Sequence, residues 1–195
     1  MIKEEVLQKW ASAPVATKYR YTHEKIREAL DKNLEIVAKN NGNNISASNY
    51  RVYLQGSYAN STNIKVDSDV DVIVELKDIL FSYDVNDLTE DEKKEFHSTY
   101  PNTSSYTFER FKNDVQLALQ LFFEEKVEYA SKCLKLPQDI LRVNADIIAC
   151  FEHRKYERFT FYTRDKFIPG IKFYNTDTNK KIINYPEKHR INCEA

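Results

Sequence analysis

The sequence lacks the features that mark membrane proteins, secreted proteins and cysteine-based metal proteins. No apolar run reaches the roughly 18 residues that a membrane-spanning helix needs. The N-terminal residues MIKEEVLQKW lack the apolar core of a signal peptide, so we expect a cytoplasmic protein. The three cysteines, Cys133, Cys150 and Cys193, show neither pairing nor metal-ligand spacing, which favours reduced thiols.

A strongly basic surface is also missing. The net charge is −1, which argues against a broad nucleic-acid surface. The charge is nevertheless uneven, because residues 132–192 carry 13 Lys or Arg against 7 Asp or Glu. This asymmetry suits a cleft that binds a small polyanion such as a nucleotide, although ordinary surface charge explains it equally well.

The composition that is present suits a folded domain. The chain has 195 residues, of which 42% are hydrophobic and 13% aromatic. That length allows one domain with a sizeable core, or one domain with a fragment of another. We expect a packed globule, because a chain this rich in apolar and aromatic residues is unlike a disordered one.

The residue pattern predicts an α+β fold, with helices packed on one face of a mixed sheet. Helical spacing of apolar residues marks a long helix near the N-terminus and a second helix later, while alternation and β-branched residues mark strands. The residues between 84 and 104 are polar and predict an exposed connection with one helical turn. The predicted helices span 22–39 and 106–125, and the predicted strands span 50–55, 68–76, 132–136 and 142–151, followed by a hairpin over 170–186 that turns at NTDTN.

Two acidic residues in the predicted strand SDVDVIVEL are candidates for metal ligands. Asp69 and Asp71 are two positions apart, so in a strand both side chains leave the same face, while Val70, Val72 and Val74 face a helix. Carboxylates that share a face repel each other unless a cation lies between them, and Mg²⁺ or Mn²⁺ prefers oxygen ligands. A solvated strand edge is an alternative. A calcium loop is excluded because Val72 and Asp78 stand where that loop needs Gly and Glu.

A Gly-Ser dipeptide upstream makes the pattern more specific. Gly56 and Ser57 follow the strand that ends at Gln55, in the stretch QGSYANSTNIKVDSDVDVIVEL. Glycine lets the backbone approach a phosphate closely, and a hydroxyl with helix-start amides can donate to phosphate oxygens. A Gly-Ser pair followed by an Asp-x-Asp strand therefore indicates a nucleotide site.

This stretch resembles the signature of the polymerase β-like nucleotidyltransferases, and in detail the bacterial cGAS/DncV-like enzymes that make cyclic or linear oligonucleotide signals in antiphage defence. The similarity extends to RVNADIIACFEHRKY and TDTNKKIINYPEKH, and it is strongest to the clade that makes pyrimidine-containing cyclic dinucleotides. It implies a polymerase β-like core of mixed, mostly antiparallel strands with a long N-terminal helix. It also implies synthesis of cyclic nucleotides from nucleoside triphosphates with release of pyrophosphate.

The resemblance assigns roles to individual residues. Asp69, Asp71 and Asp146 would hold two divalent ions, Mg²⁺ or Mn²⁺, while Gln55, Gly56 and Ser57 would contact the donor nucleotide. Asp146 is also conspicuous in its own right, as the single charge in the apolar stretch NADIIACF. A buried carboxylate needs a partner, and from the residues alone a nearby Arg or Lys serves as well as a metal.

The chain stops at Ala195, soon after INYPEKH, whereas the family that it resembles continues with a helical lobe. The resemblance therefore implies that residues 1–195 are the catalytic core and that this lobe is missing or truncated. Two alternatives to a cyclic nucleotide synthase stay open. One is a non-catalytic nucleotide-binding module, and the other is an enzyme that transfers a single nucleotide to a protein or small molecule.

Overall fold

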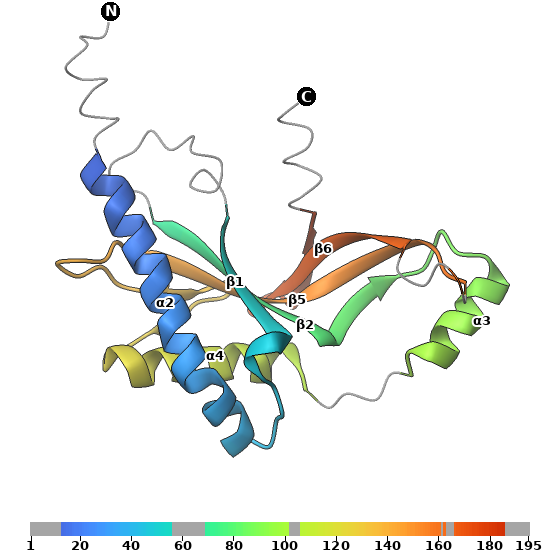
Figure 1. Ribbon diagram of the computed structural model, residues 1–195, viewed down its shortest axis with the longest axis horizontal. Coiled ribbons are helices and arrows are strands. Elements are labelled where there is room, and N and C mark those ends of the chain that lie inside the picture. The colour runs from blue at the N-terminus through green and yellow to red at the C-terminus, as the bar shows by residue number, and fades with distance from the viewer. Residues whose placement is uncertain (1–12, 56–68, 102–105, 161, 163–165, 186–195) are drawn as a thin grey trace, which may run out of the picture.

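The fold is a seven-stranded mixed sheet with two helices packed on one face (Figure 1). The computed structural model describes residues 13–55, 69–101, 106–160, 162 and 166–185. The elements in chain order are α2 (Ala13–Asn40), the short 3₁₀ helix η1 (Ala47–Asn49), β1 (Tyr50–Gln55), β2 (Val70–Asp84), α3 (Glu90–Thr99), α4 (Phe108–Phe123), β3 (Glu128–Tyr129), β4 (Leu134–Leu136), β5 (Ala145–Arg158), β6 (Lys166–Asn175) and β7 (Lys180–Asn184).

The strands follow the order β1-β2-β5-β4-β3, and β6 pairs with β5 and β7. The central pair, β2 and β5, is parallel, while the other pairs are antiparallel. The predicted α+β class and mixed, mostly antiparallel sheet are therefore confirmed. β2 and β5 are far apart in the sequence, but their parallel pairing places Asp71 next to Asp146.

The two covering helices bury apolar stripes against one face of β2 and β5. On α2, Ile26, Leu30 and Leu34 are fully buried, and on α4 the same holds for Phe111 and Val115. All five belong to one core with the apolar side chains of the central strands. Both predicted helices are confirmed, and α2 begins nine residues before the predicted start. In the described part of the chain, no helix is long and apolar enough to cross a membrane.

The segment between β2 and α4 differs from the prediction of an exposed connection. Residues 90–99 form the complete helix α3, which lies at the far end of β2 and β5, away from α2 and α4 (Figure 1). The Thr89 hydroxyl accepts a hydrogen bond from the Glu92 amide, while the Glu92 carboxylate accepts from the amide of Thr89. Phe96 is fully buried against Tyr156 and Phe159 in a second, aromatic core. A single large apolar residue anchors this otherwise polar helix.

Candidate active site

Three of the predicted site residues lie in one row across three neighbouring strands. Asp71 of β2 is the register partner of Asp146 of β5, and Gln55 of β1 is the partner of Asp71 on the other side. Neighbouring strands lie about 4.8 Å apart, and side chains at paired positions leave the same face. The fold therefore brings Gln55, Asp71 and Asp146 together, although they are spread over 92 positions of the sequence.

This row faces away from the helices. Val70, Val72 and Val74 are fully buried in the core formed with α2 and α4, as the alternation predicted. Asp71 alternates with them and is half-buried on the opposite face, as is Asp146. Asp69 immediately precedes β2 and is exposed, where it lines a pocket of about 340 Å³ at the edge of the sheet. All three carboxylates thus lie at or just before the start of the central strands β2 and β5.

The carboxylates influence one another electrostatically. Burial raises the pKa of Asp71 above its ordinary value, and the negative charges of Asp146 and Asp69 raise it further. Among the described residues, no lysine or arginine lies within 4.0 Å of these three carboxylates as an ion-pair partner. This holds even for Lys135, which is the register partner of Asp146 on β4. The row therefore concentrates negative charge that no lysine or arginine of the described residues neutralises through an ion pair.

Such a set of oxygen donors fits a hard divalent cation such as Mg²⁺ or Mn²⁺. Within the described ranges, no three His, Cys, Asp or Glu side chains are already arranged closely enough to hold a metal ion. The fit to a cation therefore rests on the donor type and on the shared face.

The predicted phosphate-gripping residues can be placed only in part. Gln55 is the last residue of β1 and is half-buried beside Asp71. Gly56 and Ser57 follow it directly in the sequence but lie outside the described residues. Their role stays a prediction.

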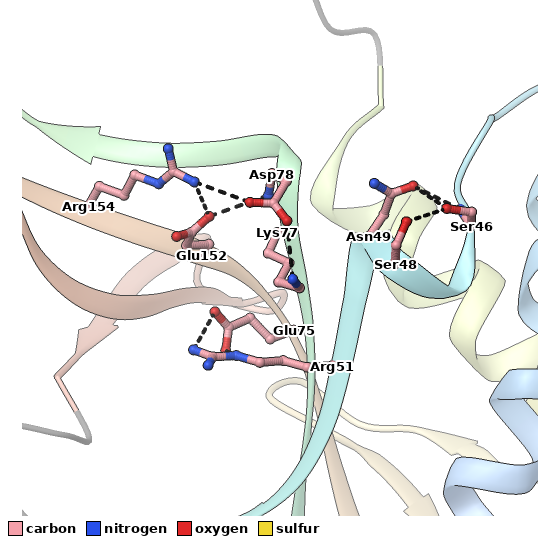
Figure 2. A network of polar contacts seen from close by, with 9 residues as sticks. All are labelled: Ser46, Ser48, Asn49, Arg51, Glu75, Lys77, Asp78, Glu152 and Arg154. Carbon is pink, nitrogen blue, oxygen red and sulfur yellow. Dashed lines mark hydrogen bonds and ion pairs between the residues drawn. The ribbon is translucent and has the colours of Figure 1, made fainter. Parts of the chain in front are cut away.

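A second row of polar side chains lies on the same face, four residues further along β2. Glu75 is fully buried, and its carboxylate accepts two hydrogen bonds from the Arg51 guanidinium, at 2.9 and 3.1 Å. The Tyr53 hydroxyl donates a third at 2.8 Å. Figure 2 shows Arg51 and Glu75 facing each other, separate from the group in which Arg154 contacts Glu152 and Asp78. Glu75 is therefore a carboxylate whose charge the protein itself neutralises.

Comparison with known proteins identifies the fold that holds this site. The model of the family described as "Nucleotidyltransferase domain" matches residues 24–174, which include all three carboxylates. The chain belongs to the nucleotidyltransferase domain family. The resemblance seen in the sequence is thereby confirmed at the level of the family.

Curated relatives narrow the resemblance to cyclic nucleotide synthases. This nucleotidyltransferase chain is 37% identical to the cyclic nucleotide synthase CdnE01 of Staphylococcus haemolyticus, over 97% of the chain and 60% of the relative. It is 35% identical to the cyclic UMP-AMP synthase of Rhodothermus marinus, over 100% of the chain and 61% of the relative. The chain thus spans about 60% of the length of these relatives.

A solved structure agrees with this assignment. The Rhodothermus marinus CdnE c-UMP-AMP synthase, determined with Apcpp and Upnpp, superposes with a TM-score of 0.74 at 34% sequence identity. The match covers 98% of this chain and 59% of that structure. The polymerase β-like fold and the resemblance to cyclic dinucleotide synthases, one of which uses a pyrimidine nucleotide, are confirmed.

Sequence reasoning treated Cys133 only as a reduced thiol, but the nucleotidyltransferase fold places it beside Asp146. Cys133 immediately precedes β4, two residues before Lys135, which pairs with Asp146. Burial, followed by the negative charge of Asp146, raises the pKa of the Cys133 thiol to about 11. The thiol therefore stays protonated near neutral pH and lies close to the Asp146 carboxylate. No local sequence signal pointed to this contact, because it depends on the pairing of β4 with β5.

Proposed function

We propose that this chain is the core of a metal-dependent nucleotidyltransferase that makes cyclic di- or oligonucleotide second messengers from nucleoside triphosphates. The observation that carries the proposal is the pairing of Asp71 with Asp146 on adjacent parallel strands, with Asp69 close by and no cationic side chain bound to them in the described residues. The named activities of the relatives support the class of product. We further propose a role in antiphage defence, which the family resemblance implies, and a cytoplasmic location, which the N-terminal residues led us to expect.

The reaction transfers a nucleotidyl group. A ribose hydroxyl of the acceptor attacks the α-phosphorus of the donor, the bond from that phosphorus to the bridging oxygen breaks, and pyrophosphate leaves as the hydroxyl proton is lost. Phosphoryl transfer of this kind depends on positioning and on neutralising charge more than on covalent help from the protein. Two bound divalent ions would supply charge neutralisation at the attacking and leaving oxygens.

Each residue of the site has a proposed task. Asp69 and Asp71 would hold both Mg²⁺ or Mn²⁺ ions, and Asp146 would complete the site of the ion that lowers the pKa of the acceptor hydroxyl. Gly56 and Ser57 bind the phosphates of the departing pyrophosphate, and Gln55 contacts the same nucleotide. The protonated Cys133 thiol lies beside Asp146, and we assign it a role in positioning that carboxylate. The opposite, apolar face of β2 and β5 packs against α2 and α4 and so fixes the strands that carry the row.

The first test removes the carboxylates of β2. The 195-residue chain is incubated with α-labelled nucleoside triphosphates and Mn²⁺ or Mg²⁺, and the products are separated. We expect a cyclic dinucleotide from the unmodified chain and none from Asp69→Ala/Asp71→Ala, with circular dichroism unchanged. The matched control Asp87→Ala/Asp91→Ala removes the same charge at side chains that are 54% and 97% exposed, and it should retain activity.

The same assay separates the other two functions. Labelled protein would identify an enzyme that transfers single nucleotides to a polypeptide. Nucleotide binding with no labelled product from any chain would identify a non-catalytic module. Full activity in Asp69→Ala/Asp71→Ala would remove both residues from the mechanism.

A further inference from the structure

The hydroxyl of Thr22 is a fully buried polar group that joins helix α2 to the start of β5. Thr22 lies inside α2 and is 0% exposed. Its hydroxyl donates to the Lys18 carbonyl at 2.8 Å and accepts a hydrogen bond from the Val143 amide at 3.1 Å. Because the single hydroxyl proton is directed at Lys18, an oxygen lone pair is left for the Val143 amide. The contact joins segments that are 121 positions apart, so it exists only in the folded chain.

Val143 leads directly to the backbone that carries the carboxylates. The carbonyl of the next residue, Asn144, accepts a hydrogen bond from the Val70 amide at 2.9 Å. Val70 lies between the other two carboxylates of the site in the sequence, and Asp146 follows Asn144 by two positions. The hydroxyl on α2 is therefore connected, through two residues before β5, to the start of both central strands.

The segment before β5 depends on side chains for its position. Residues 137–144 lie outside any helix or strand, and the pairing of β5 with β2 and β4 begins only at Ala145. The Val143 amide thus has no ladder partner among the described strands, and the Thr22 hydroxyl takes that place. Further from the carboxylates, Arg142 is 5% exposed and contacts Asp139 and Glu125 at 2.7 and 2.6 Å. Arg142 therefore holds the outer part of the segment, and Thr22 holds the part next to the site.

We propose that Thr22 is a positioning residue, whose hydroxyl fixes the start of β5 so that Asp146 stays in register with Asp71. The inference rests on the proposed function and adds to it a residue of α2, a helix to which the reaction above assigns only packing. Loss of the hydroxyl leaves the Val143 amide without its partner and frees the backbone that precedes Asp146. Hydrogen bonds that orient metal ligands from outside the site commonly change metal affinity or activity by roughly 10–100-fold. Since Thr22 acts through the backbone, the lower end of that range applies.

Four variants separate positioning from a general effect on stability. Thr22→Val removes the hydroxyl but keeps the branched shape, and Thr22→Ser keeps the hydroxyl. Asn33→Ala is the matched control, because Asn33 ties the same helix to α4 instead, donating to the Ala118 carbonyl at 3.1 Å. Thr99→Val is the second control, since the Thr99 hydroxyl makes the same bond within a helix, to the Glu95 carbonyl of α3 at 2.9 Å.

The first readout needs neither turnover nor metal. Amide hydrogen exchange is measured by NMR in EDTA, and global stability is measured by urea denaturation. We expect the Val143 and Val70 amides of Thr22→Val to exchange about tenfold faster than the loss of global stability explains, and Thr22→Ser to restore the original rates. Asn33→Ala and Thr99→Val should change these two amides no more than their global stability does. Unchanged exchange at Val70 in Thr22→Val would overturn the connection to β2.

The second readout is the affinity for the divalent ion. Mn²⁺ binding to the nucleotide-free chain is followed by electron paramagnetic resonance of the free ion, and synthesis is measured against Mn²⁺ concentration. Both the dissociation constant and the half-maximal concentration should rise about tenfold in Thr22→Val, while KM for nucleoside triphosphate at saturating Mn²⁺ changes less than about twofold. Thr22→Ser should restore both values, and the two controls should keep them. A loss confined to stability, with unchanged Mn²⁺ affinity, would overturn the positioning role.

This inference and the proposed function fail in different ways. If Asp69→Ala/Asp71→Ala abolishes synthesis while Thr22→Val keeps its Mn²⁺ affinity and exchange rates, Thr22 only packs and the nucleotidyltransferase function stands. If Asp69→Ala/Asp71→Ala retains synthesis, the proposed metal mechanism itself is wrong. Faster exchange at Val70 in Thr22→Val would then still show that Thr22 holds the start of the central strands.

Discussion

Two rows of side chains on the same face of the sheet handle buried negative charge in opposite ways. The first row contains Gln55, Asp71 and Asp146, and the second contains Arg51, Glu75 and Cys150. The rows are four residues apart, or about 13 Å along the strands. In the first row, the β1 residue paired with the β2 carboxylate is Gln55, which carries a neutral amide. In the second row, the β1 residue at that position is Arg51, which carries a positively charged guanidinium.

We propose that this difference distinguishes a structural carboxylate, Glu75, from a functional one, Asp71. Glu75 is fully buried and its oxygens accept three hydrogen bonds from Arg51 and Tyr53. Asp71 is only half-buried, faces a second carboxylate across the strand pair and has a raised pKa. A buried charge is costly unless it is paired, so a paired carboxylate stabilises its surroundings. We propose that the clustered carboxylates, which have no cationic partner among the described residues, bind a cation brought by the substrate or solvent.

The largest expected effect is the loss of activity when the Asp146 carboxylate of the first row is replaced by an amide. The same replacement at Glu75 in the second row is the control. Asp146→Asn keeps the shape of the side chain but removes its negative charge, so we expect pyrophosphate release to fall about a thousandfold, equivalent to about 4 kcal/mol. Glu75→Gln, the matched change in the second row, should keep activity per folded molecule within about threefold. The measurement is initial rate at saturating divalent ion, normalised to folded protein. Equal losses of activity in Asp146→Asn and Glu75→Gln would contradict the distinction between the two rows.

The second row should instead control stability. Arg51→Met leaves the buried Glu75 carboxylate with Tyr53 as a hydrogen-bond donor, so we expect the free energy of unfolding to fall by about 2 kcal/mol. The value lies below that for a fully buried pair because the Arg51 side chain is 49% exposed. Urea denaturation measures it, with Arg27→Met as the control, since Arg27 is 62% exposed and only 4.0 Å from Asp31. Adding Glu75→Leu to Arg51→Met should recover most of the loss. Arg51→Met without loss of stability would contradict the pairing.

The local sequence pattern predicted the strands that carry the first row, but not which strands pair with each other. The alternation SDVDVIVEL indicates a strand with Asp69 and Asp71 on one face, and the structure confirms that Val70, Val72 and Val74 are buried on the other. The pattern cannot show that Asp146 is the register partner of Asp71, because that depends on parallel pairing between distant segments. The family resemblance brought Asp146 into the prediction.

The sequence was less informative where a single residue decides the packing. The stretch LTEDEKKEF is too polar to predict a packed helix, yet Phe96 anchors α3 in the aromatic core. A usable signal was present, since Thr89 and Glu92 have the spacing of a capping box. Glu75 gave no such signal: it shares the face of Asp71 in the strand, and its partner Arg51 is 24 positions away. Which acidic residue is neutralised is therefore a property of the fold, not of the strand's own sequence.

The smallest expected effect is a pH-dependent gain in stability from Asp71→Asn. Burial first, and then the charges of Asp146 and Asp69, raise the pKa of Asp71 above its ordinary value of 3.8. At lower pH the carboxyl is protonated in both folded and unfolded chains and contributes no difference. As pH rises, the unfolded chain releases this proton first, so ionisation of Asp71 favours unfolding. In EDTA near pH 7, Asp71→Asn should therefore be more stable than the unmodified chain.

This gain should shrink toward about pH 4, where ionisation of Asp71 is suppressed in the folded chain. Asp91→Asn, at a side chain that is 97% exposed, is the control and should change stability little at either pH. Urea denaturation at both pH values gives the comparison, and millimolar Mg²⁺ should then stabilise the unmodified chain more than Asp71→Asn, because a cation relieves the repulsion in the first row. If the stability difference between Asp71→Asn and the unmodified chain changed with neither pH nor Mg²⁺, Asp71 would be neutralised by the protein, as Glu75 is.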